Sequence, residues 1–139
     1  AVGTLSGTVR MLDAVAWADA EQLVRQLVAQ IVAPYGVSAD VGYQRGVPPV
    51  VNEEESTRLL GTVLDRALGP HGHVSTTQSL GGEDFGWYLD RVPGAMARLG
   101  TRTPGGTTYD LHQGNLRIDE KATAIGARVL AEVAVEALG

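Results

Sequence analysis

Three histidines and one pair of adjacent carboxylates are the residues of this sequence best suited to chemistry. His112 lies in the polar stretch DLHQGNLRIDE, immediately before the start of a predicted helix. A neutral imidazole is a common ligand for divalent metals, and loops held by rigid elements often carry function. One histidine is not a site, so the residues alone leave His112 either a metal ligand, a catalytic group or an ordinary loop residue.

The other candidates have simpler explanations beside their chemical ones. His71 and His73 form an H-x-H pair, but the pair follows Leu-Gly-Pro in a predicted helix-to-strand loop, which favours exposed loop histidines over metal ligation. Glu83 and Asp84 follow two glycines. They are either paired carboxylates, part of a backbone anion nest, or an acidic helix N-cap, and the cap is favoured.

Composition limits the partners and the compartment. The chain has 139 residues, enough for one compact domain, with a formal net charge of −5 and no cysteine. The eleven Lys and Arg residues are scattered, so we expect no nucleic-acid partner. A disulfide framework and a thiolate metal site are excluded. No apolar run approaches the roughly 20 residues that span a bilayer, and no signal pattern opens the chain, so we expect a cytoplasmic protein without a membrane partner.

Four helices are predicted to position these residues. The first lies within 13–36, where Leu23, Leu27 and Ile31 recur every four residues and Asp13 or Asp19 supplies the cap. Asn52 is expected to cap the second helix, with Glu55 at the capping-box position. A short aromatic helix begins near residue 85, and an amphipathic helix with Asp119 as its N-cap ends the chain.

Strands are predicted between the helices. Alternating apolar and polar residues, or short apolar runs, indicate extended segments at 1–12, 39–43, 73–77 and 95–101. A strand-helix-strand unit would therefore open the chain. The Pro48-Pro49 step is the best candidate for a domain boundary.

Four blocks of sequence carry a resemblance to a known family. They are, in order, SGTVRMLD, APYGVSADVGYQRGVPPVVN, SLGGEDFGWYLDRVPGAMARLGT and LHQGNLRIDE. Their order and spacing resemble the C-terminal part of the dinuclear metallo-amidohydrolases, which include hippurate hydrolases, N-acyl-amino-acid hydrolases and indoleacetyl-amino-acid hydrolases. The resemblance covers essentially the whole chain. A related aminoacylase or dipeptidase with another specificity is the second candidate within this class.

The resemblance implies an α/β fold in two parts. Residues 1–49 would be the second half of an inserted lid and dimerisation domain, built as strand-helix-strand. Residues 50–139 would be the C-terminal segment of an aminopeptidase-type α/β catalytic domain that holds two divalent metal ions, Zn, Mn or Ni. The family relationship also implies a homo-oligomer formed through the lid.

The resemblance assigns roles to particular residues. His112 matches the family's last metal ligand. Arg10 matches a lid arginine that either approaches a substrate carboxylate or oxyanion, or makes a structural ion pair. The loop of Gly81, Gly82, Glu83 and Asp84 resembles the loop beside the substrate pocket, with Asp84 ordering the turn.

Several parts of the family's chemistry have no counterpart here. The other metal ligands and the Glu-Glu pair that supplies the general base lie in blocks absent from this sequence. The resemblance therefore implies a fragment of an enzyme that hydrolyses the amide bond of N-acyl amino acids or related conjugates. We expect this chain alone to be inactive and free of metal. The alternative from another class is a stand-alone dimerising interaction module without catalytic activity.

Overall fold

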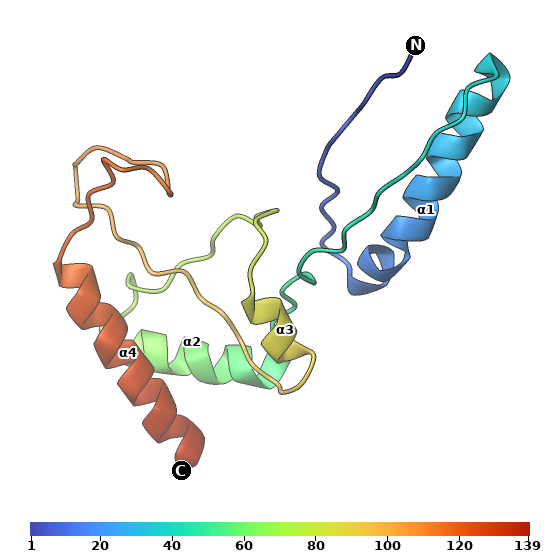
Figure 1. Ribbon diagram of the computed structural model, residues 1–139. Coiled ribbons are helices and arrows are strands. Elements are labelled where there is room, and N and C mark those ends of the chain that lie inside the picture. Colours follow the sequence, from blue (N-terminus) through green and yellow to red (C-terminus); the bar gives the residue numbers. More distant parts are fainter. The chain divides into compact units, whose positions relative to one another are not determined.

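All 139 residues are described by the computed structural model, and every regular element in it is a helix. The elements are α1 (Ala14–Val32), the 3₁₀ helix η1 (Ala33–Tyr35), α2 (Glu54–Leu68), α3 (Phe85–Leu89) and α4 (Lys121–Leu138), as drawn in Figure 1. The chain between them runs as turns and open segments. None of the helices is long and apolar enough to cross a membrane.

The predicted α/β fold is wrong, because the chain contains no strand. The segments 1–12, 39–43, 73–77 and 95–101 carry strand patterns, but none of them forms a strand. Alternation of apolar and polar residues expresses a preference for extended backbone, whereas a strand exists only where two segments exchange ladder hydrogen bonds. Residues 1–10 are all exposed, so the strand-helix-strand lid expected at the start of the chain is absent.

Helix α1 forms as its sequence predicts. The Asp13 carboxylate accepts a 2.7 Å hydrogen bond from the Ala16 amide, which satisfies one of the unpaired donors at the helix start. At the other end the chain tightens into η1 over Pro34 and stops at Gly36, whose φ of 64° is a left-handed conformation that glycine adopts easily.

Helix α2 begins with a different cap from the predicted one. The Glu53 carboxylate accepts hydrogen bonds from the amides of Ser56 at 2.7 Å and Glu55 at 2.8 Å. Asn52, the expected cap, bonds to the backbone of Met96 instead. Glu55 does not close a capping box and pairs with Arg58 at 3.1 Å. The local signal for a helix start was correct, but the cap lies one residue later.

The chain divides into two compact units. Unit 1 comprises Ala1–Val51 and Thr77–Val92, and unit 2 comprises Asn52–Thr76 and Pro93–Gly139. This division follows packing within the chain and does not test the predicted division into lid and catalytic parts at residues 49 and 50, which stays a prediction.

Unit 1 is organised around an aromatic pair that joins α1 to α3. The rings of Trp17 and Trp87 meet edge to face with centroids 6.1 Å apart, and the Arg45 guanidinium lies 5.1 Å from the Trp17 ring centroid. Gly86 is buried against Pro48, at a point where an added Cβ would lie 2.5 Å from the Pro48 carbonyl oxygen. Only glycine allows α3 to approach residue 48 this closely.

Unit 2 is organised around the packing of α2 against α4. Val63 on α2 is fully buried and Ala122 on α4 is 4% exposed. The Asp119 amide donates to the Thr101 carbonyl at 2.7 Å, and the Asp119 carboxylate accepts from the Lys121 amide at 3.0 Å. Asp119 therefore satisfies the first amide of α4, but the N-cap position belongs to Glu120, one residue later than predicted.

Candidate functional site

Arg10 lies against the glycine loop that the sequence singled out. Its Nη1 donates a 2.6 Å hydrogen bond to the carbonyl of Leu80, seventy positions away in the sequence. A Cβ built on Gly82 would lie 4.0 Å from the same nitrogen and 3.1 Å from Cγ2 of Val47. Unit 1 thus brings together two of the predicted site elements, the arginine and the loop.

The loop itself is ordered by its backbone. Gly81 donates to the Ser79 hydroxyl at 3.0 Å, and the carbonyls of Glu83 and Asp84 accept from the amides of Gly86 and Trp87 at 3.0 and 3.1 Å. Asp84 holds the N-cap position of α3, but its carboxylate accepts no capping hydrogen bond. The favoured cap interpretation is therefore correct for the position of Asp84 and wrong for its side chain.

The charges around this loop limit what it can bind. A guanidinium is well suited to a carboxylate or a developing oxyanion because its donors form a planar fork. Glu83 and Asp84 stand within the same loop, and two carboxylates nearby oppose an incoming anion. The arrangement can hold a carboxylate only where that ligand contacts Arg10 and the Gly81 and Gly82 backbone rather than the acidic side chains.

His112 occupies an unusual backbone conformation in unit 2. Its φ is 64°, and it is the one residue other than glycine with positive φ. A left-handed conformation costs a residue with a side chain roughly 1–2 kcal/mol, and such conformations cluster at functional positions. The side chain is exposed, and the turn that follows it, over residues 113–116, is closed by a 3.1 Å hydrogen bond from the Leu116 amide to the Gln113 carbonyl. No sequence signal predicted this conformation.

The H-x-H pair does not form a joint site. Nδ1 of His73 lies 3.3 Å from Oδ1 of Asp65 on α2, and its Cε1 would lie 3.5 Å from a Cβ added to Gly61, an ordinary contact distance. His71 takes no part in this contact. His73 therefore packs on α2 beside a carboxylate, which agrees with the structural interpretation favoured for the pair.

A dinuclear metal centre does not fit the residues of this chain on their own. Two metal ions need several imidazole or carboxylate ligands converging on one place. No group of three or more His, Cys, Asp or Glu side chains gathers anywhere in the structure. His112 offers one imidazole and belongs to no such group.

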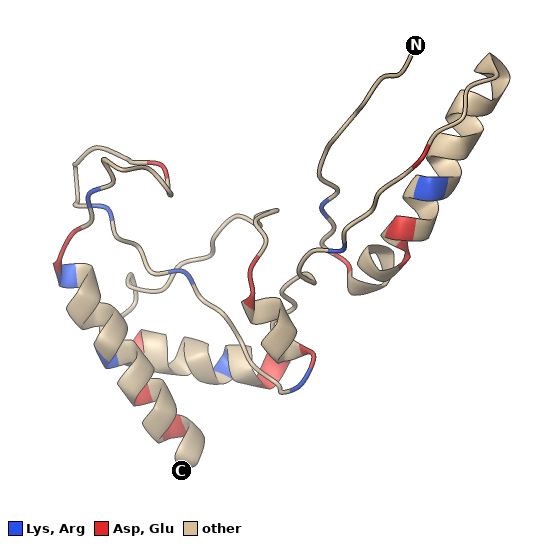
Figure 2. Ribbon diagram, in the orientation of Figure 1, with Lys and Arg blue, Asp and Glu red and all other residues tan.

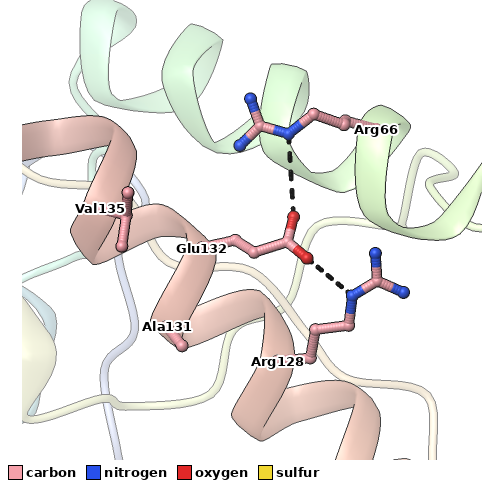
Figure 3. Close-up of a pocket in the computed structure, with 5 residues that line it drawn as sticks. All are labelled: Arg66, Arg128, Ala131, Glu132 and Val135. Carbon is pink, nitrogen blue, oxygen red and sulfur yellow. Dashed lines mark hydrogen bonds and ion pairs between the residues drawn. The ribbon is translucent and has the colours of Figure 1, made fainter. Parts of the chain in front are cut away.

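A charged cluster between α2 and α4 was missed by the sequence reasoning. Glu132 accepts from Nε of Arg128 at 2.6 Å and lies 3.8 Å from Nε of Arg66, as Figure 3 shows. Nη1 of Arg66 donates to Glu136 at 2.8 Å. Hydrogen bonding and attraction from Glu136, then Glu132, raise the pKa of Arg66 above its already high value. The spacing of Arg128, Glu132 and Glu136, four residues apart, was the available signal.

The cluster is structural rather than a binding site. Arg66 and Arg128 both form ion pairs with glutamates of the cluster, so neither guanidinium carries an unpaired charge that would attract a ligand. The Lys and Arg residues elsewhere are spread along the chain without forming a run, as Figure 2 shows.

Comparisons with known proteins give one family and several relatives. Residues 3–136 match the family described as Peptidase family M20/M25/M40. The chain is 44% identical over 128 residues to a putative glutamate–cysteine ligase of Rhodococcus jostii, covering 92% of this chain and 16% of that protein. It is 36% identical over 132 residues to a probable hydrolase of Synechocystis, and the match covers 94% of this chain and 34% of that protein.

A third relative has a more specific name. The chain is 31% identical over 118 residues to the N-acetyl-L-cysteine deacetylase of Bacillus subtilis, covering 85% of this chain and 27% of the deacetylase. In each of these three comparisons the chain spans about a third of the relative or less. No solved structure matches the chain.

Proposed function

Because this chain belongs to the Peptidase family M20/M25/M40, we propose that it works as part of a longer metal-dependent amidohydrolase. The substrate class proposed is the N-acyl amino acid or a related amide. The observation that carries the proposal is the family match through residues 3–136, and the deacetylase of Bacillus subtilis supports the substrate class. The ligase name of the Rhodococcus relative is not carried over, because the match covers only 16% of that protein.

In this proposal Arg10 and its loop contact the carboxylate of the amino-acid part of the substrate. Two contacts support this role, the hydrogen bond from Arg10 to the Leu80 carbonyl and the closeness of Gly82 to the same guanidinium. Both place the guanidinium beside the backbone of the glycine loop. Substitution of Arg10 by Gln would then raise KM in the complete enzyme more than it lowers kcat, because the contact exists before and during reaction.

His112 would contribute one imidazole to the metal centre of the complete enzyme. That centre would hold two divalent ions, with zinc, manganese and nickel as the candidates suited to imidazole. The remaining ligands and the general base would come from polypeptide outside this chain. The 139 residues alone are therefore proposed to bind no metal tightly and to hydrolyse nothing.

The alternative proposal is an interaction module without catalytic activity. It is supported by the exposed apolar row on α1, where Leu23, Leu27 and Ile31 are 48%, 45% and 64% exposed. A second copy covering this row would form a homodimer. Leu27→Glu would then shift the chain to monomer in size-exclusion chromatography with light scattering, whereas Gln30→Glu on the same helix would not.

The deciding experiment is the intact mass of the protein in its source cells, followed by assay of that protein on N-acetyl amino acids. A protein larger than the 14.6 kDa of this chain that releases acetate, and loses this activity on His112→Ala, supports the hydrolase. A larger protein that cleaves no N-acyl amino acid contradicts the proposed substrate class. A native mass of 14.6 kDa with dimerisation and no hydrolysis favours the interaction module.

A further inference from the structure

Asn52 makes two hydrogen bonds to the backbone of one distant residue of unit 2. Its Nδ2 donates to the Met96 carbonyl and its Oδ1 accepts from the Met96 amide, both at 2.9 Å. Beside it, the Glu53 amide donates to the Gly94 carbonyl at 2.9 Å. Because the side-chain amide pairs with both backbone groups of Met96, it fixes which residue of that segment lies beside the start of α2.

The loop that carries His112 is closed at its base by one hydrogen bond. The Asp119 amide donates to the Thr101 carbonyl at 2.7 Å, and both residues are half-buried. Residues 102–118, here called the His112 loop, are exposed apart from the half-buried Tyr109. Such an exposed loop has little packing of its own, so the closure at its base limits where it can lie.

One short segment joins the contacts of Met96 to the base of the His112 loop. It ends at Thr101, and in Figure 1 it runs from the start of α2 toward the loop that precedes α4. On the way Leu99 lies against α4, where a Cβ added to Gly126 would come within 2.9 Å of its Cδ2. A slip of one residue along an extended segment moves each atom by about 3.3 Å, a shift that the hydrogen bond at the loop base would not survive.

We infer that Asn52 is a positioning residue for His112 and that it acts through the segment from Met96 to Thr101. The helix leaves Asn52 available for this role, because Glu53 caps α2 in its place. This role rests on the proposed function, in which His112 acts, whereas the effect of Asn52 on the loop can be measured on this chain alone. Loss of the Asn52 amide should let the segment shift along α2 and so loosen the base of the His112 loop.

The test uses the whole 139-residue chain and follows amide exchange by NMR. Asn52→Ala should speed exchange of the Met96 amide about tenfold, the effect of losing hydrogen bonds of ordinary strength. Exchange of the Asp119 amide, which bonds to Thr101 and not to Asn52, should rise by about threefold, because the loop base is loosened but not lost. Helical circular dichroism should stay unchanged, because Glu53 still caps α2.

The imidazole C–H signals give an independent readout, since the chain has three histidines. At one fixed pH, the His112 signals should shift in Asn52→Ala. The His73 signals should not shift, because His73 contacts Asp65 on α2 and lies outside the His112 loop.

Two further variants separate positioning from general damage to unit 2. Asn52→Asp keeps the acceptor for the Met96 amide and loses the donor, so exchange at Asp119 should lie between that of the wild-type chain and that of Asn52→Ala. Thr62→Ala removes another exposed side-chain hydrogen bond of unit 2, the 3.0 Å bond from Thr62 to the Arg58 carbonyl, and should change neither readout.

Three results would overturn the inference. Faster exchange at Met96 with unchanged exchange at Asp119 and unchanged His112 signals would show that Asn52 acts only locally. Equal acceleration throughout α2 and α4 would make Asn52 a general stabilising residue, and loss of helical structure in both Asn52 variants would make it a folding residue. A loosened loop base in this chain, together with a longer protein that hydrolyses no N-acyl amino acid, would contradict the proposed function and support the action of Asn52 on the loop.

Discussion

At the scale of single residues, the cap of α2 gives the first prediction. Hydrogen bonds from the Ser56 amide, then the Glu55 amide, lower the pKa of Glu53 below its ordinary value of 4.5. A carboxyl whose pKa is lower in the folded state stabilises the fold above its unfolded pKa, and this contribution disappears as pH falls through the folded pKa. Glu53→Gln should therefore lower Tm at pH 7, and the difference should disappear at acid pH, once the pH has fallen through the folded pKa of Glu53.

Thermal unfolding followed by circular dichroism at both pH values checks this prediction. Glu54→Gln is the matched control, because it removes a carboxylate in the first turn that accepts no capping bond. An equal Tm loss for Glu53→Gln at both pH values would show that packing, and not the charged cap, is responsible.

A second prediction at this scale concerns Gly86. A methyl group there would lie 2.5 Å from the Pro48 carbonyl oxygen, too close for any real contact. Gly86→Ala should destabilise unit 1 by about 1–3 kcal/mol, the usual cost of forcing atoms into a packed site. Gly46→Ala, with nothing within 4 Å of its added Cβ, is the control for glycine replacement itself. Chemical denaturation with equal midpoints for both variants would contradict the close approach.

The sequence predicted which residues lie in the candidate site better than it predicted the contacts that these residues make. Arg10 and the loop from Gly81 to Asp84 lie together, although the pattern alone could not show that Arg10 donates to Leu80. The cap assignment failed by one residue because Asn52, the preferred cap type, is bonded to a partner 44 residues away, which leaves Glu53 to accept from the helix amides. The positive φ of His112 follows from how its loop closes, which no residue type specifies.

At the scale of elements, helices could be predicted and strands could not. A helix satisfies its backbone within its own segment, so the apolar spacing, the Asp13 cap and Gly36 were sufficient to place α1. A strand needs a second segment, and alternation in 39–43 says nothing about whether that neighbour exists. The strand predictions failed for that reason, and the α/β fold class failed with them.

The pairing of α2 with α4 gives the element-scale prediction. Arg66→Gln removes its contacts with Glu136 at 2.8 Å and Glu132 at 3.8 Å. Because Arg66 is 53% exposed, the loss of stability should be small and should shrink further in 1 M salt. Arg58→Gln, which breaks a pair lying within α2, should cost less at low salt. Urea unfolding at two salt concentrations measures the difference. If Arg66→Gln lowered the free energy of unfolding by the same amount at both salt concentrations, the contact between α2 and α4 would not be electrostatic.

At the scale of the whole molecule, the candidate residues belong to two separate units. Arg10 and its loop lie in unit 1 and His112 in unit 2, and neither unit gathers the ligands that a dinuclear centre requires. The family match explains how one chain can carry such residues without a complete site, since it spans about a third of the relatives compared or less.

The division into two units predicts which helices lose stability when a residue in one unit is substituted. Each unit has its own packing centre, the Trp17 and Trp87 pair in unit 1 and buried Val63 in unit 2. Gly86→Ala should therefore speed amide exchange in α1 and α3 and leave exchange in α2 and α4 unchanged. Val63→Ala should speed exchange in α2 and α4 and leave α1 and α3 unchanged. It should lower the stability of unit 2 by roughly 1–4 kcal/mol, as truncation of a buried aliphatic side chain usually does. Exchange measured peptide by peptide distinguishes these patterns. If either substitution accelerated exchange equally in all four helices, the chain would unfold as one cooperative body, and the two units would be a feature of packing without thermodynamic independence.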